Sequence, residues 1–243
     1  MNDIEVKGLK KIYSGVTVLN IPELQVAKGE SFGLVGNNGA GKTTFFRLIL
    51  DLIRADKGEI FSKNEGVSRS ENWKKYTGSF LDEGFLIDYL SPEEYFEFVG
   101  NLNNLSKGDV QEFLESFKDF FNDEIFAKKK YIRDLSKGNQ KKVGIAAAIM
   151  SHPEILVLDE PFSNLDPTSQ ILLKKLLTKL SEEKQTTMLI SSHDLNHVTE
   201  VCKRIVVLHK GDMVHDIETA PNTLKELETY FADQIRILDS ARA

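Results

Sequence analysis

A glycine-rich stretch of the form G-x-x-x-x-G-K-[ST] constrains this chain more than any other feature. It runs from Gly36 to Thr43 and reads Gly-Asn-Asn-Gly-Ala-Gly-Lys-Thr. A short apolar segment, 31–35, precedes it, and apolar residues at helical spacing follow it as far as Ile53. This pattern indicates phosphate binding when a strand comes before it and a helix after it. The sequence therefore predicts a phosphate-binding loop between a strand and a helix.

The residue types in this stretch suit an anion. Glycines at 36, 39 and 41 permit unusual backbone geometry and leave no side chain between backbone N–H groups and a phosphate. The N-terminus of the following helix adds partial positive charge at the same point. In this pattern the lysine, Lys42, reaches the β- and γ-phosphates, and the hydroxyl of Thr43 binds Mg²⁺.

Composition narrows the class of protein. The net charge of −6 argues against a nucleic-acid-binding surface, so we expect no nucleic acid partner. Cys202 is the only cysteine, which excludes an internal disulfide and fits a reducing cytoplasm. We expect no signal peptide, because the N-terminus lacks a basic region followed by an apolar run. The longest uncharged apolar run, 143–150, is too short for a bilayer, so any membrane-spanning part must come from another chain.

Two carboxylates follow a run of four apolar residues. The run, 155–158, reads as a strand buried on both faces, and Asp159 and Glu160 follow it directly. Asp159 can bind the Mg²⁺ that Thr43 also binds, and Glu160 can orient or deprotonate an attacking water. His193 follows a second buried run, 186–190, and can reach the same edge of the sheet. A capping Asp-Glu pair without chemistry is the alternative.

Residues 85–135 have a different character and predict a small helical lobe. Ser91-Pro92 begins one helix, and a second follows Ser106 and carries apolar residues as far as Phe121. Nine of the fifteen phenylalanines lie between Phe80 and Phe126. They either build the core of this lobe or form an exposed partner site. The basic run Lys128–Lys130 either is a solvated face or adds positive potential near bound phosphates.

Elsewhere the patterns predict α/β structure. We expect short antiparallel strands in 3–30, a strand at 76–81, a helix ending at Met150, and a helix that begins after Asp166. Asp194 can cap a further helix. A hairpin over 204–217 and an amphipathic helix over 221–238 complete the chain.

The order of these motifs resembles the nucleotide-binding subunit of an ABC transporter. The matching stretches are Tyr13, Gly36–Thr44, Asp82, Leu135–Gln140, Ile155–Glu160, Ser163–Asp166 and His193. The phosphate loop alone marks any P-loop NTPase, whereas Leu-Ser-x-Gly ahead of the Asp-Glu strand singles out the ABC family. The resemblance implies a P-loop NTPase core with a mainly parallel sheet, an antiparallel β subdomain and an inserted α-helical subdomain at about 85–145. It also implies an ATPase domain over 1–225 and a helical tail over 226–243.

The resemblance implies a role for each matching residue. Tyr13 would stack on adenine, Asp159 would support Mg²⁺, Glu160 would be the catalytic base and His193 would contact the γ-phosphate. Asp82 falls at the position of the family's loop glutamine and would meet Mg²⁺ or water. The phosphates of ATP would be bound by Gly36, Asn37, Asn38, Gly39, Ala40, Gly41, Lys42, Thr43 and Thr44.

Three further residues would serve a second copy. In the family, Ser136 and Gly138 cap the ATP that is bound to another subunit, and Asp166 crosses the interface between subunits. A homodimer, or a heterodimer with a similar ATPase, would then close head to tail around two ATP molecules. A separate integral membrane permease would convert this closure into transport, and it would keep the chain at the cytoplasmic face of the cell membrane.

The chain departs from the family pattern in two places. Lys137 and Asn139 replace residues of the usual Leu-Ser-Gly-Gly-Gln signature, and Asp82 with Glu83 replaces an amide by carboxylates. Both variations are similar to those of bacterial exporter-type ATPases carried on separate chains, which favours export. The alternatives are a soluble ABC-type ATPase in cluster assembly and a nucleotide-binding regulator without turnover. The intact set of Lys42, Asp159, Glu160 and His193 argues against the regulator.

Overall fold

The computed structural model describes residues 1–126, 130–183 and 185–240. Its strands are β1 (Asn2–Tyr13), β2 (Val16–Ala27), β3 (Ser31–Val35), β4 (Lys57–Ser62), β5 (Glu65–Gly66), β6 (Thr77–Phe80), β7 (Ile155–Leu158), β8 (Thr187–Ser192), β9 (Arg204–His209) and β10 (Asp212–Glu218). Its α-helices are α1 (Lys42–Ile49), α2 (Pro92–Leu102), α3 (Lys107–Ser116), α4 (Lys118–Phe121), α5 (Lys137–Met150), α6 (Pro167–Glu183), α7 (Leu195–Val201) and α8 (Thr223–Ser240). Short 3₁₀ turns lie at Asn72–Lys75, Glu83–Phe85 and Ile132–Asp134.

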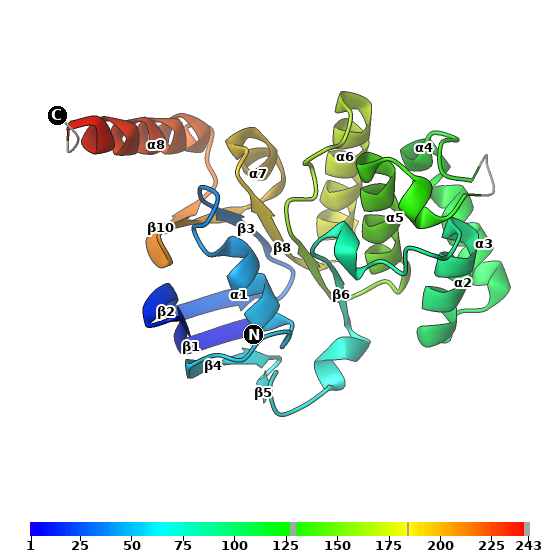
Figure 1. Ribbon diagram of the computed structural model, residues 1–243, viewed down its shortest axis with the longest axis horizontal. Helices are drawn as coiled ribbons and strands as arrows, with labels where there is room; N and C mark the ends of the chain where they lie inside the picture. Colours follow the sequence, from blue (N-terminus) through cyan, green and yellow to red (C-terminus); the bar gives the residue numbers. More distant parts are fainter. Residues whose placement is uncertain (127–129, 184, 241–243) are drawn as a thin grey trace.

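The strands form a single sheet in the order β5-β4-β1-β2-β10-β9-β3-β8-β7-β6 (Figure 1). From β9 to β6 all neighbours are parallel, and β5, β4, β1 and β2 pair antiparallel. The two parts meet where β10 pairs with β2 through Asp212 and Asn20. The predicted α/β fold, with a mainly parallel core and an antiparallel β subdomain, is therefore confirmed.

The prediction of short strands in 3–30 is wrong, because β1 and β2 have 12 residues each. Gly8 lies inside β1 at a φ of 61°, and the pairing of β1 with β4 shifts register between Lys7 and Lys10. A glycine in this conformation lets a strand bulge and continue where another residue would favour a turn. The antiparallel pairing that was expected in 3–30 is confirmed by the register of β1 with β2.

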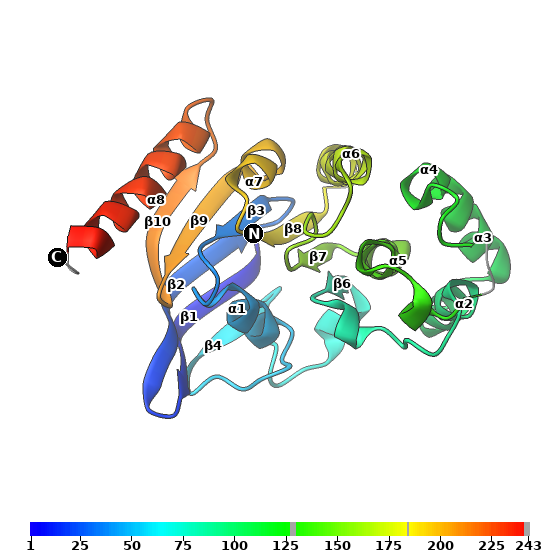
Figure 2. The ribbon, with the colours of Figure 1, turned by 45° about the horizontal axis from the view of Figure 1, so that its top comes forward.

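The sheet separates two apolar cores (Figure 2). Along β7, Leu156 and Leu158 face the core that contains α5, α6, α7 and the helical lobe. Ile155 and Val157 face the other core, which lies between the sheet and α1. Because both faces are covered, β3, β7 and β8 are buried along their whole length, as the continuous apolar runs predict.

The helical lobe comprises α2, α3 and α4. Ser91 and Ser106 each begin a helix with a complete capping box, which confirms both predicted helix starts. The prediction of one helix from Ser106 to Phe121 is wrong, because α3 ends at Ser116 and α4 follows after Phe117. Phe117 and Phe121, on either side of this break, lie in the same core. Five rings are buried here, and Phe85 and Phe98 are exposed; the buried ones are Phe96, Phe113, Phe117, Phe120 and Phe121.

The predicted domain limits fall inside helices. Position 145 lies within α5, and position 225 lies within α8, so the described backbone has no break at either limit. In Figure 2, α8 lies beside β10, where the rings of His215 and Tyr230 are in contact. Of the basic run, Lys128 and Lys129 lie outside the described residues, and Lys130 is exposed. Among the described helices, none combines the length and apolar character needed to cross a bilayer.

Candidate nucleotide-binding site

The glycine loop lies at the carboxyl end of β3 and leads directly into α1. Gly39 and Gly41 adopt φ values of 81° and 107°, in the left-handed region that favours glycine. A Cβ added to Gly36 would approach the carbonyl oxygen of Leu208 to 2.5 Å. The loop therefore requires glycine at these positions, and α1 directs its N-terminus toward the space that the loop encloses.

Lys42 is buried at the first turn of α1 and binds two oxygen atoms of its own chain. Its Nζ donates to the carbonyl oxygen of Gly36 at 2.6 Å. It also lies 3.2 Å from Oε1 of Glu160. The predicted loop lysine and the predicted catalytic base are thus in direct contact.

Asp159 is buried where β7 ends. Its Oδ2 accepts a hydrogen bond from Oγ1 of Thr43 at 2.5 Å, and its Oδ1 accepts one from Oγ of Ser191. Burial raises the pKa of Asp159, although these hydrogen bonds and Lys42 act in the opposite direction. A buried carboxylate beside a hydroxyl offers the oxygen ligands that Mg²⁺ prefers, so the residues present fit this ion.

Glu160 adopts a φ of 48°, which is rare for a residue with a side chain. Its backbone N–H donates to Oγ of Ser191 at 2.9 Å. Its Oε2 lies 2.8 Å from Nδ1 of His193, at the carboxyl end of the neighbouring strand β8. The predicted pair of Glu160 and His193 therefore meets at one edge of the sheet.

Tyr13 reaches the same site from the end of β1. It is 48% exposed, and Nζ of Lys11 lies 5.0 Å from the centre of its ring. A cleft of about 300 Å³ joins it to the loop. The residues that line this cleft are Tyr13, Val18, Asn37, Asn38, Gly39, Ala40, Gly41, Lys42, Thr43, Thr44 and Glu160.

Asp82 is not brought into contact with the other predicted metal ligands. Its Oδ1 accepts a hydrogen bond from the backbone N–H of Gly84 at 2.7 Å, and its Oδ2 lies 3.8 Å from Arg47. No hydrogen bond joins it to Thr43 or Asp159, all of which the structure describes. Asp82 caps its own 3₁₀ turn, and this local hydrogen bond occupies Oδ1 of its carboxylate.

Ser136 and Gly138 lie at the N-terminus of α5, as the resemblance implies. Ser136 caps the helix by accepting a hydrogen bond from the N–H of Asn139 at 3.2 Å. A Cβ on Gly138 would approach the carbonyl oxygen of Asn164 to 2.6 Å, so this helix end packs closely on the loop 163–166. Asp166 caps α6 by accepting from the N–H of Ser169 at 3.0 Å.

Three residues of the site were not singled out in the sequence. Ser191 bridges the carboxylate of Asp159 and the backbone N–H of Glu160. Gln140 donates to the carbonyl oxygens of Ile132 and Leu135 at 3.1 Å each. Lys141, buried in α5, donates to the carbonyl oxygen of Glu160 at 2.8 Å. The only sequence signal for Ser191 is its place at the end of a buried strand, two residues before His193. Lys141 gave no signal, because a lysine in a polar run reads as exposed.

Comparison with known proteins gives a consistent result. The sequence model of the ABC transporter family matches residues 19–163. The bacitracin transport ATP-binding protein BcrA of Enterococcus faecalis is 36% identical, over 88% of this chain and 68% of that protein. The uncharacterized ABC transporter ATP-binding protein YhaQ of Bacillus subtilis is 35% identical, over 91% of this chain and 73% of that protein.

Solved structures share the fold. A dimeric bacterial ABC transporter cassette, MJ0796, superposes with a TM-score of 0.80 at 25% identity, covering 89% of this chain and 99% of that chain. This chain spans 62 to 76% of the length of eight curated relatives. Matches of this extent, together with the ordered motifs and their geometry, establish that the chain belongs to the ABC transporter ATP-binding family.

Proposed function

We propose that this chain binds and hydrolyses ATP as the nucleotide-binding subunit of an ABC transporter. The observation that carries the proposal is the convergence of Lys42, Thr43, Asp159, Glu160 and His193 at one edge of the sheet, next to the glycine loop. The chemistry of phosphoryl transfer needs positioned groups and stabilisation of charge, and these residues supply both.

Each residue of the site has a proposed task. Lys42 and the loop N–H groups bind the phosphates, and Tyr13 stacks on the adenine ring at the opposite end of the cleft. Thr43 and Asp159 hold Mg²⁺, which neutralises charge on the phosphates. Glu160 accepts the proton of the attacking water, and His193 orients Glu160 and contacts the γ-phosphate.

We extend the proposal to a pair of copies that close head to tail. Ser136 and Gly138 are presented at a capped helix N-terminus, where backbone N–H groups favour an anion. Their hydrogen bonds are local, and among the residues that the structure describes none joins them to the phosphate loop. We assign them, with Asp166, to the ATP that a second copy binds.

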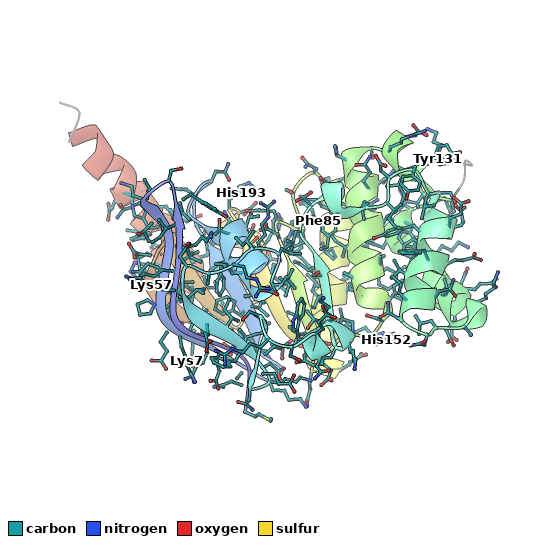
Figure 3. All side chains as sticks on the ribbon, turned by 60° about the horizontal axis from the view of Figure 1, so that its bottom comes forward. Lys7, Lys57, Phe85, Tyr131, His152 and His193 are labelled. Atoms are coloured by element: carbon teal, nitrogen blue, oxygen red, sulfur yellow. The ribbon has the colours of Figure 1, made fainter. Side chains whose placement is uncertain are left out.

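A separate permease would dock beside the helical lobe. A groove of about 710 Å³ is lined by β6, α2, α5 and the segment 50–52 that follows α1. Phe85 lies at the rim of this groove and is 54% exposed (Figure 3). Exposed apolar side chains around a groove of this size are typical of a partner site. We propose that this partner spans the membrane and that the complex works in export, following the two departures in the signature and at Asp82.

We also propose a division of the chain into domains. We assign the ATPase domain to 1–225 with its helical subdomain at about 85–145, and the tail to 226–243. The core between the sheet and α1 lies next to the phosphate loop. The core on the other face of the sheet joins the lobe to α5.

The catalytic proposal is tested with Glu160→Gln, which keeps the shape of the side chain and removes the proton acceptor. We expect Mg²⁺-dependent ATP hydrolysis to fall by at least about 100-fold, and the variant to form a dimer in ATP on size-exclusion chromatography. Glu154→Gln is the matched control, because Glu154 precedes β7 and pairs with Lys63 on the surface. Hydrolysis at the wild-type rate in Glu160→Gln would remove Glu160 from this role.

The docking proposal is tested with Phe85→Asp in cells that make the natural complex. We expect the variant to leave the membrane fraction for the soluble fraction while it keeps its affinity for ATP. Tyr89→Asp is the control, since Tyr89 is 63% exposed but does not line the groove. Equal membrane association of both variants and the wild type would contradict this docking site.

A further inference from the structure

Lys141 is a buried lysine on α5 whose ammonium group contacts the loop that carries Glu160. The residue is 4% exposed. Its Nζ donates to the carbonyl oxygen of Glu160 at 2.8 Å and to Oγ of Ser163 at 2.6 Å. A lysine ammonium has three donors, and a buried one must use them. Two of the three are therefore committed to the segment 160–163.

The backbone of Glu160 is held at both of its peptide groups. The N–H of Glu160 is bonded to Ser191, and its carbonyl oxygen accepts from Lys141 and, at 2.9 Å, from Oγ of Ser163. A left-handed backbone at a non-glycine residue is strained and persists only where its surroundings impose it. Lys141 provides the charged hydrogen bond among those that impose this conformation, which aims the carboxylate at Lys42 and His193.

The third direction of the ammonium faces Glu83. Nζ of Lys141 lies 3.8 Å from Oε1 of Glu83, a buried oxygen with no hydrogen-bond partner among the described residues. Glu83 belongs to the 3₁₀ turn that also carries Phe85 at the rim of the groove. The ion pair therefore links the rim of the groove to the backbone of Glu160 through one side chain.

We propose that Lys141 is a positioning residue for Glu160, and that Glu83 anchors it from the rim of the groove. This inference rests on the proposed ATPase function. Lys141 contacts neither the glycine loop nor Tyr13, so it acts on the orientation of Glu160 and leaves nucleotide binding alone. A displacement of the turn 83–85 would move the ammonium and, through it, the Glu160 peptide.

The first test compares Lys141→Met with the wild type in steady-state ATP hydrolysis and in amide hydrogen exchange without nucleotide. Methionine keeps the length of the side chain and removes the donors. We expect kcat to fall about 10-fold or more, because small misplacements of a catalytic group are costly, while KM for ATP changes less than about twofold. We also expect faster exchange of the Glu160 and Ser163 amides.

Lys142→Met is the matched control for the loss of a buried charge. Lys142 is the next residue of α5 and is buried equally, but its ammonium faces Asp166 and Glu124 at 3.7 and 3.9 Å. We expect it to leave exchange at Glu160 unchanged. If Lys141→Met does not fold, Ser163→Ala removes the hydroxyl that shares the contact. Its expected result is a smaller loss of kcat, again with faster exchange at Glu160.

Glu83→Gln tests the anchor. As a single substitution, Glu83→Gln is expected to lower kcat. In a Lys141→Met background it is expected to lower kcat no further, because the effects of coupled residues are not additive. If kcat of the double variant falls by the product of the two single losses, the role of Glu83 is overturned. Unchanged exchange at Glu160 or unchanged kcat in Lys141→Met would overturn the role of Lys141. If the wild type shows no ATP turnover but the Glu160 amide still exchanges faster in Lys141→Met, the positioning of Glu160 is supported and the proposed ATPase function is refuted.

Discussion

Ser191 joins the carboxylate of Asp159 to the backbone N–H of Glu160, and its replacement by alanine gives a measurable prediction. The hydroxyl donates to Asp159 and accepts from the N–H of Glu160 at 2.9 Å. Ser191→Ala removes a hydrogen bond to a charged group, which contributes about 1.5–3 kcal/mol, and leaves an N–H of Glu160 without its partner at a cost of about 1–3 kcal/mol. Because the two effects share one site, we expect a total of about 3 kcal/mol.

For a chain of this length, 1 kcal/mol corresponds to about 2–4 °C in Tm, so Ser191→Ala should melt roughly 10 °C below the wild type. Calorimetry without nucleotide measures this difference. Ser192→Ala is the matched control, because Ser192 is also buried but accepts a single hydrogen bond, from the N–H of Asp194 at 3.0 Å. We expect it to lose about 3 °C. Equal losses in the two variants would refute the bridging role of Ser191.

Three other predictions concern the lobe, a histidine and the helix end. Phe96→Ala should destabilise the chain by about 3–5 kcal/mol in urea unfolding, because its ring is fully buried, whereas exposed Phe98→Ala should stay within about 0.5 kcal/mol. Burial lowers the pKa of His197 below its ordinary 6.5, so the unfolded chain takes up the proton first. Melting temperature should therefore fall as pH drops below 6.5, and less so in His197→Gln. Gly138→Ala, whose Cβ would meet Asn164 O at 2.6 Å, should weaken the ATP-dependent dimer in size-exclusion chromatography.

The features that the sequence predicted well are local. The glycine loop, the capping box at Ser91 and the cap at Asp194 depend on residues within a few positions of one another. Buried strands such as β7 are also recognisable, since a continuous apolar run needs cover on both faces. The relative placement of Lys42, Asp159 and Glu160 followed because carboxyl ends of parallel strands meet at one edge.

The features that the sequence did not predict depend on contacts between distant segments. Ser191 lies 31 positions from Glu160, and Lys141 lies 19 positions from it. Serine and lysine are common at surfaces, so neither residue type marks a buried contact. The orientation of Asp82 depends on its bond to Gly84, which competes with any approach to Asp159. The position of Asp82 in the motif does not show which partner its carboxylate binds.

The order of strands also limits how copies of this chain can associate. The strands at the two ends of the sheet are short, since β5 has two residues and β6 has four, and the 12-residue strand β1 is paired on both sides, with β2 and β4. Long exposed edges invite pairing with another chain and lead to aggregation. Because β5 and β6 offer few free backbone groups, extension of the sheet by a second copy at either of its two ends is disfavoured.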